Sequence, residues 1–407
     1  MKRVFFAIII LVAAVLFAGC SHGGNTIYDD DYHPGEDMQY FYTTAMNSTA
    51  HIQEIDRGCV FYHKGFMYVY DSESESIQPL CSKANCMHEK ETDQEKLSEC
   101  NACLSGLMTD LFDTLAVMVY KEDVYVYYMS SIPETVSRVI CRISLDGSSK
   151  DYIYECNGHG VVQHRGYIYL KVNDYTFDKE KNSIKNQFKV IRLDIRSRSI
   201  KEEDVFIPEE NVTGGGVFTA YGNYVYFSLM YEGEKGCIYA YDTRNHSIRE
   251  IEELEYDNTY LTPSWNGKKL VYKDYQSDQD SLYETQLIGI RPDGTDRTVE
   301  LERIPQVYNV VYDTKYLYVN NAKVLINPEI KRFWVYDENM ELVDEFTLPE
   351  TDREVEDPPI GGEKYQYLVF DEEEGGEWGL YIWDKSEIGT LHGRPYAQQK
   401  AVYEDRQ

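Results

Sequence analysis

The chain has 407 residues, and its 70 acidic side chains outnumber its 40 lysines and arginines, which gives a formal net charge of −30 at pH 7. A surface of this sign repels nucleic-acid phosphates and anionic headgroups, so the composition argues against nucleic acid as a partner. Tyrosine is abundant, with 37 residues, and proline is sparse, with 12. Cations, cationic peptides and neutral glycans are left as candidate ligands.

The first twenty residues, "MKRVFFAIIILVAAVLFAGC", indicate a secretory signal. Lys2 and Arg3 precede an apolar run, Val4–Ala18, that is shorter than the ~20 residues of a membrane span. The end of the run, "LFAGC", resembles the bacterial lipobox, with Phe17 where leucine is usual. This resemblance implies that residues 1–19 are a lipoprotein signal peptide and that Cys20 carries the lipid. A plain signal peptide or a short anchor helix is the alternative.

A polar stretch, "SHGGNTIYDDDYHPGED", follows Cys20. Glycine, proline and three consecutive aspartates cannot bury enough apolar surface to fold alone. We therefore expect residues 20–37 to be a flexible tether, and residues 38–407 to be one folded domain outside the cytoplasm. The expected location is the outer face of the bacterial cytoplasmic membrane, the cell surface.

A hairpin pattern repeats along the folded part. Each copy has an aromatic-rich alternating strand, a turn with Asp, Gly or Asn, and a second alternating strand; the seven copies begin at Tyr68, Ile140, Val190, Ile238, Leu287, Phe333 and Leu380. Every copy but the first follows another strand pair of the same kind. Period-two alternation is typical of half-buried antiparallel strands. The repeat predicts an all-β protein, a β-propeller of seven four-stranded blades, with six or eight blades or a plain β-sandwich as alternatives.

The first unit lacks an obvious innermost strand. Either "MQYFYTTAM" (Met38–Met46) or the tail "KAVYEDRQ" (Lys400–Gln407) is predicted to supply it. The tail would join both ends of the chain in one blade and lock the ring.

Two segments resemble known propellers. "PSWNGKKLVY" (263–272) is similar to the PxWSPDGxxLxF element of TolB-like blades, shortened by two residues, and "CRISLDGSSKDYIY" (141–154) is similar to a hairpin of YWTD-like blades, although no YWTD tetrapeptide is present. The likeness covers nearly all of residues 38–407. Together with "LFAGC" and "PLCSKANCMH", the chain resembles a group of β-propeller surface lipoproteins from Gram-positive gut anaerobes, in which C-x4-C-x-H is followed by C-N-A.

A Cys/His-rich insertion, residues 81–103, follows the first unit. The set Cys81, Cys86, His88 and Cys100 supplies three thiolates and one imidazole, which is a complete tetrahedral zinc set of the closed, structural kind. Disulfides are the alternative, because thiols outside the cytoplasm usually oxidise; Cys81–Cys86 and Cys100–Cys103 are the candidate pairs. The sequence leaves zinc and disulfides open.

Four other cysteines, Cys59, Cys141, Cys156 and Cys237, lie in or beside predicted strands and are expected to be buried apolar residues. The segment after Cys103, "LSGLMTDLFDTL", has helical apolar spacing from Leu104 to Leu115 and predicts a short helix packed on the ring.

Further binding candidates are weak. Three carboxylates in "DYQSDQDS" (274–281) are a calcium candidate, but the run lacks the glycine and the distant glutamate of a dedicated loop, which favours a hydrated turn. Trp265 and Trp378 lie near turns and are candidate sugar contacts, whereas Trp334 and Trp383 are expected to pack between blades.

Catalytic motifs such as G-x-S-x-G, H-E-x-x-H and the P-loop do not occur in the chain. The sequence therefore predicts a lipid-anchored module that binds a glycan, peptide or protein. An extracytoplasmic enzyme, such as a glycan lyase or hydrolase on a propeller scaffold, is the alternative.

Overall fold

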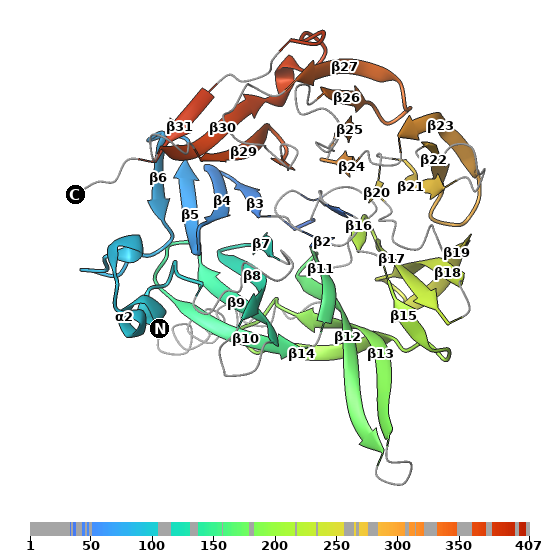
Figure 1. The fold of residues 1–407 in the computed structure, drawn as a ribbon, viewed down its shortest axis with the longest axis horizontal. Coiled ribbons are helices and arrows are strands. Elements are labelled where there is room, and N and C mark those ends of the chain that lie inside the picture. Colours follow the sequence, from blue (N-terminus) through green and yellow to red (C-terminus); the bar gives the residue numbers. More distant parts are fainter. Residues whose placement is uncertain are drawn as a thin grey trace, which may run out of the picture.

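The computed structural model describes the chain in segments (Figure 1). These are residues 33, 36–37, 43–44, 47–48, 51–104, 115–130, 137–156, 158–178, 183–215, 218–232, 235–255, 264–265, 268–275, 284–305, 309–313, 315–320, 332–347, 360–371, 377–394 and 399–403. The predicted signal peptide, Cys20 and most of the predicted helix between Leu104 and Leu115 lie outside them. Among the described residues, none of the helices is long and apolar enough to cross a membrane.

Seven sheets of consecutive antiparallel strands form a ring around one axis, and we number them as blades 1–7 (Figure 1). Blade 1 contains β3 (Ile52–Ile55), β4 (Gly58–His63), β5 (Phe66–Asp71) and β6 (Ser76–Pro79). Blade 2 contains β7 (Ala116–Tyr120), β8 (Asp123–Ser130), β9 (Ser137–Ser144) and β10 (Lys150–Cys156). Blade 3 contains β11 (Gly158–His164), β12 (Tyr167–Asp178), β13 (Ser183–Asp194) and β14 (Lys201–Phe206).

The second half of the ring follows the same order. Blade 4 contains β15 (Val212–Gly214) and β16 (Thr219–Tyr221), both paired to β17 (Tyr224–Tyr231), then β18 (Lys235–Asp242) and β19 (Ser247–Glu255). Blade 5 contains β20 (Ser264–Trp265), β21 (Leu270–Tyr275), β22 (Glu284–Ile290) and β23 (Thr298–Pro305). Blade 6 contains β24 (Asn309–Tyr312), β25 (Leu317–Asn320), β26 (Arg332–Tyr336) and β27 (Leu342–Thr347). Blade 7 contains β28 (Ile360–Gly361), β29 (Tyr365–Asp371), β30 (Trp378–Asp384) and β31 (Gln399–Val402).

Five short elements lie outside the seven blades or at their ends. They are the hairpin β1 (Thr43–Thr44) and β2 (Asn47–Ser48), the helices η1 (His88–Lys90) and α2 (Gln94–Glu99) of the insertion, and the single turn η3 (Lys385–Glu387). The prediction of a seven-bladed, four-stranded β-propeller is confirmed. Helix α2 was not predicted, because "QEKLSE" has no apolar face that would signal it.

The ring closes differently from the prediction. The innermost strand of blade 1 is β3, which lies between the two predicted candidates, and the tail strand β31 is the outermost strand of blade 7. Each blade is therefore built from consecutive strands. Blades 7 and 1 meet through side chains instead of a shared sheet. The Glu54 carboxylate accepts hydrogen bonds from the backbone N–H groups of Glu363, Lys364 and Tyr365, at 3.1, 3.2 and 3.0 Å.

The abundance of tyrosine follows from the packing between blades. Tyr127 in blade 2 and Tyr367 in blade 7 are almost fully buried, and their hydroxyls donate to backbone carbonyls of the next blade, Gly158 at 3.0 Å and Gly58 at 3.3 Å. A buried phenol thus fills the interface with its ring and satisfies its hydroxyl there. The fully buried Trp383 packs among the apolar residues of blades 6 and 7, as predicted.

Candidate metal centre

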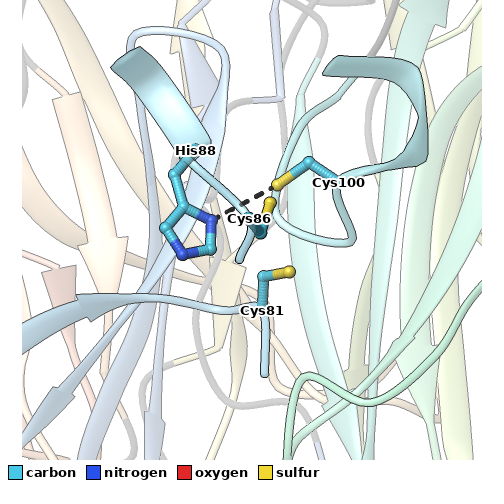
Figure 2. A group of neighbouring side chains, drawn as sticks. All are labelled: Cys81, Cys86, His88 and Cys100. Atoms are coloured by element: carbon cyan, nitrogen blue, oxygen red, sulfur yellow. Dashed lines mark hydrogen bonds between the residues drawn. The ribbon is translucent and has the colours of Figure 1, made fainter. Parts of the chain in front are cut away.

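Three cysteines and a histidine converge on the outer rim of the ring, between blades 1 and 2. The ligand atoms of Cys81, Cys86, His88 and Cys100 all lie within 4.8 Å of one another, and their side chains point toward a common centre (Figure 2). Cys100 is buried and the other three are half-buried. A zinc ion with sulfur ligands at ~2.3 Å and nitrogen at ~2.0 Å needs donors that converge in this way. The donor set therefore fits a tetrahedral metal ion such as zinc.

Local structure brings the four residues together over twenty positions of chain. His88 has a φ of +51°, in the left-handed region that residues with a Cβ seldom adopt, and its Nδ1 lies 3.5 Å from the Cys100 sulfur. Helix α2 then turns the chain back toward Cys81. Asp93 caps its N-terminus by accepting from the N–H groups of Glu95 and Lys96 at 3.0 and 3.4 Å.

The ionisation of the donors differs with their surroundings. Burial raises the pKa of Cys100, and the neighbouring Cys81 thiolate raises it further. Burial also opposes ionisation of Cys81, but the backbone N–H groups of Lys83 and Asn101 outweigh it, so the pKa of Cys81 is lowered. Burial lowers the pKa of His88 and favours the neutral imidazole, the form that binds a metal ion.

The insertion is tied to blade 1 through its backbone. The N–H of Met67 donates to the carbonyl of Ala102 at 2.8 Å, and the N–H of Leu104 donates to Gly65 at 2.9 Å. Residues around Cys103 therefore form a bridge along β5. Any ligand set held by Cys100 is fixed relative to this blade.

The same insertion is tied to blade 2 at the β9–β10 turn. The Gly147 carbonyl accepts from the Asn101 side-chain amide at 2.8 Å and from the N–H of Ser82 at 3.0 Å. The Lys150 ammonium donates to the carbonyls of Cys100 and Cys103, at 2.6 and 2.9 Å. Gly147 has a φ of +70°, and a Cβ there would lie 2.8 Å from the backbone nitrogen of Cys81, so only glycine fits.

The other cysteines separate clearly from the cluster. Cys103 lies outside the set of four converging residues and is buried against blade 1. None of the cysteines whose side chains the structure describes forms a disulfide. Cys59, Cys141 and Cys237 are buried, as predicted for small apolar residues. The side chain of Cys156 lies outside the described part.

The tryptophan predictions have different outcomes. Trp378 stacks between His63 and Tyr403, with ring centroids 4.3 and 4.4 Å away, where blades 7 and 1 meet. This contact gives its ring a packing role in the closure of the propeller. The side chain of Trp265 and most of the calcium candidate run at 274–281 lie outside the described residues, so these predictions stay untested.

A second group of functional interest was missed by sequence reasoning. Buried charges lie around one end of the ring's central axis, which we call the mouth. The Lys385 ammonium lies 3.2 Å from the Asp313 carboxylate and also donates to the carbonyls of Asp313 and Gly362, at 2.8 and 2.5 Å. Asp37 pairs with Arg165 at 2.7 Å. Each charge comes from a different part of the chain, so no local motif marks the group.

Comparison with known proteins finds likeness in structure only. No family model matches the chain, and no curated protein matches it in sequence. A prolyl endopeptidase structure is similar with a TM-score of 0.53 at 11% identity, over 91% of this chain and 50% of that one. TolB from Acinetobacter baumannii gives a TM-score of 0.39 at 13% identity, over 87% and 80%. The β-propeller domain of the Trilobed protease from Pyrococcus furiosus gives 0.46 at 16%, over 67% and 83%.

These likenesses show the fold alone, a β-propeller. The chain spans 44% of a Pyrococcus horikoshii acylaminoacyl peptidase and half of the prolyl endopeptidase, so it matches only part of those enzymes.

Proposed function

We propose that this chain is a lipid-anchored β-propeller on the outer face of a bacterial cytoplasmic membrane, where it serves as a binding or protein-interaction module. The signal-like run that ends in "LFAGC" supports secretion and lipid attachment at Cys20. The ligand class is a glycan, a peptide or a protein.

The single observation that carries the binding role is the occupation of the ring's centre by the chain itself. The hairpin β1–β2 lies inside the ring of innermost strands, β1 against β24 and β2 against β11 (Figure 1). The buried charges at the mouth also have partners, since Asp37 pairs with Arg165, and Asp313 pairs with Lys385. An enclosed catalytic pocket needs open space lined by a few convergent polar groups at such a place. Recognition through the outer surface of the ring fits this arrangement better.

The test is a glycan and peptide binding screen on the full-length protein in detergent. A ligand that is retained and recovered chemically unchanged supports the module. Steady cleavage of the retained ligand would favour the enzyme instead.

We further propose that Cys81, Cys86, His88 and Cys100 hold a structural zinc ion. Such a site has all four positions filled by protein, so its role is to fold the insertion and not to activate water. The insertion has few buried apolar residues of its own, chiefly Cys100, Ala102 and Cys103 with Leu97 against them. A metal ion would replace the missing core and clamp blade 1 to blade 2.

Elemental analysis tests the zinc site, with Cys103→Ser as the matched control. Anaerobically purified protein should contain close to one equivalent of zinc. Cys81→Ser and Cys100→Ser should lose it, whereas Cys103→Ser should keep it, because Cys103 lies outside the cluster. Less than a tenth of an equivalent in the unsubstituted protein would exclude the site.

Lipid attachment has its own test. Replacing Cys20 with Ala should abolish incorporation of labelled fatty acid and move the protein out of the membrane fraction. Unchanged labelling in Cys20→Ala would contradict the anchor.

A further inference from the structure

The N-terminal segment enters the ring at one defined mouth. Asp37 forms a backbone bridge with His164, the last residue of the innermost strand β11. The Glu36 carbonyl accepts from the N–H of Arg165 at 2.8 Å and from the Gln163 side chain at 3.0 Å. The chain therefore docks where the innermost strand of blade 3 ends.

A buried ion pair holds this docking point. The Asp37 side chain has no solvent exposure, and its two oxygens accept from Arg165 Nε at 2.7 Å and Nη2 at 3.1 Å. Arg165 Nη1 donates to Asn223 of blade 4 at 3.0 Å. A two-point contact between guanidinium and carboxylate fixes both position and direction. Removing one partner would leave an uncompensated buried charge.

The described residues on either side of the hairpin β1–β2 lie at different ends of the innermost strands. The innermost strands contact one another in sequence around the centre and, because every blade has the same strand order, they all run in the same direction. Asp37 lies beside the end of β11, whereas Ile52 begins β3. The two residues are therefore at opposite ends of the ring's central axis. The hairpin β1–β2 lies between them, inside the ring (Figure 1).

The segment that leads to the lipid anchor therefore leaves the ring on the side where Asp37 lies. We define the inner turns as the turns that join the first and second strands of each blade; they surround the mouth at Asp37. We propose that the inner turns face the lipid bilayer and that the opposite side of the disc faces outward to partners. The inference rests on the proposed lipid anchor at Cys20.

Chain length supports this orientation. Residues 21–36 separate Cys20 from Asp37, and at ~3.5 Å per residue their full extension is about 60 Å. A domain of this size has a radius of gyration of about 21 Å. A path from the central mouth out to the rim and down the side has a similar length to the fully extended segment. If the inner turns face the bilayer, residues 21–36 can span the distance without being fully extended. If the opposite side faces the bilayer, the same residues must be fully extended.

Charge at the inner turns supports the same partner. Lys121, Lys315 and Lys364 are exposed in the inner turns of blades 2, 6 and 7. In the part of the chain that the structure describes, none of these three ammonium groups pairs with a carboxylate; Lys121 and Lys315 lie over the rings of adjacent tyrosines. The exposed Glu122 and Glu363 lie beside two of these lysines, so the inner turns carry charges of both signs, unlike a chain with a net charge of −30 as a whole. Anionic headgroups attract such lysines when they lie close to the bilayer surface.

The experiment uses full-length lipidated protein in vesicles of phosphatidylglycerol and phosphatidylethanolamine. A photo-crosslinking amino acid replaces either Glu122, in an inner turn, or Glu232, in the turn after β17 on the opposite side. Both glutamates are exposed, so they are matched positions. Lipid adducts are counted by mass spectrometry. We expect several-fold more adducts at position 122 than at position 232.

Two variants sharpen the result. The double variant Asp37→Ala with Arg165→Ala removes the docking pair without leaving a buried charge, and should bring the two adduct yields together. The triple variant Lys121→Glu, Lys315→Glu and Lys364→Glu leaves the buried pair intact, and should lower the yield at position 122 on anionic vesicles but not on neutral phosphatidylcholine. Equal yields in the protein with Arg165, or more adducts at 232, would overturn the orientation. Absence of fatty-acid labelling at Cys20 in the unsubstituted protein would instead overturn the anchor, so the two failures are distinguishable.

Discussion

The candidate metal centre at the rim and the charged mouth at the ring's centre are held together in opposite ways. The four metal-ligand candidates lie within twenty residues of chain and have little apolar surface around them. The pairs Asp37–Arg165 and Asp313–Lys385 join residues 128 and 72 positions apart, and they are buried by whole blades. In the proposed zinc site, an added ion would compensate for the missing core of the rim unit. At the centre, the packed blades of the ring hold the charged residues in position.

This contrast teaches where each region is vulnerable. The rim unit should fail locally, because its few buried residues form a small cluster separate from the core of the ring. The central pairs should fail globally, because a buried charge without its partner destabilises every conformation that keeps the ring closed.

Metal removal is expected to have the largest effect and should test the local failure. Structural zinc contributes about 10 kcal/mol or more to the folding of small zinc peptides. Chelation should therefore abolish amide protection in residues 81–103, measured by hydrogen exchange, while blade 5 keeps its protection. Loss of protection in both regions would show that the rim unit is not independent of the ring.

Replacing Lys385 with Met should test the global failure. The substitution leaves the Asp313 carboxylate buried without its cation, which costs roughly 3–5 kcal/mol in the free energy of unfolding. Urea unfolding gives the measurement. The double variant Lys385→Met with Asp313→Leu is the control, and it should recover much of the loss because no charge stays buried. A single variant as stable as the original protein would contradict the view that the central pair holds the ring.

Lys171 offers the reverse case, a buried cation that pairs with no carboxylate among the residues that the structure describes. Its ammonium is 2% exposed and lies 5.6 Å from the Phe218 ring centroid, and burial lowers the pKa of Lys171 to about 7. Because the folded state binds this proton less tightly than the unfolded state, stability should rise with pH between about 7 and 10. Two pH units correspond to about 2–3 kcal/mol.

The substitution Lys171→Met should remove this rise and stabilise the protein at pH 7. Urea unfolding of both proteins at pH 7 and pH 9 gives the change in the free energy of unfolding with pH. The other titrating groups are the same in both proteins, so their contributions cancel when the two changes are subtracted. An identical pH slope in Lys171→Met would show that Lys171 keeps its ordinary pKa.

The smallest expected effect concerns a contact between blade 7 and the Cys/His-rich insertion. The Tyr403 hydroxyl, just after the last strand of blade 7, donates to the Glu89 carboxylate beside His88. Tyr403→Phe keeps the aromatic ring that stacks on Trp378 and removes the hydroxyl that makes this exposed hydrogen bond, so it should cost at most about 1 kcal/mol. Thermal unfolding should show a shift of a few degrees or less, and zinc content should stay unchanged. A loss of zinc would show that the contact with blade 7 supports the metal site.

The sequence by itself determined the repeated unit and the donor set at the rim. Alternation of Tyr, Val and Ile with polar residues is a local property of a strand, and the hairpin turns at Asp146–Gly147 and Asp293–Gly294 have the positive glycine φ angles that the pattern requires, +70° and +80°. The blade count followed from counting hairpins. The cysteines and His88 were readable because ligands within one short loop need only the loop to bring them together.

Only the tertiary structure decided how the ring closes and how the chain enters it. Glu54 finds its amide donors in residues 363–365, and Asp37 finds Arg165 across 128 positions. Nothing in a single turn such as "HRG" distinguishes an arginine that pairs with a distant carboxylate from one that is solvated. Such pairs depend on the angle between blades, which is set by the packing of all seven, and so they have no signature within any one segment of the chain.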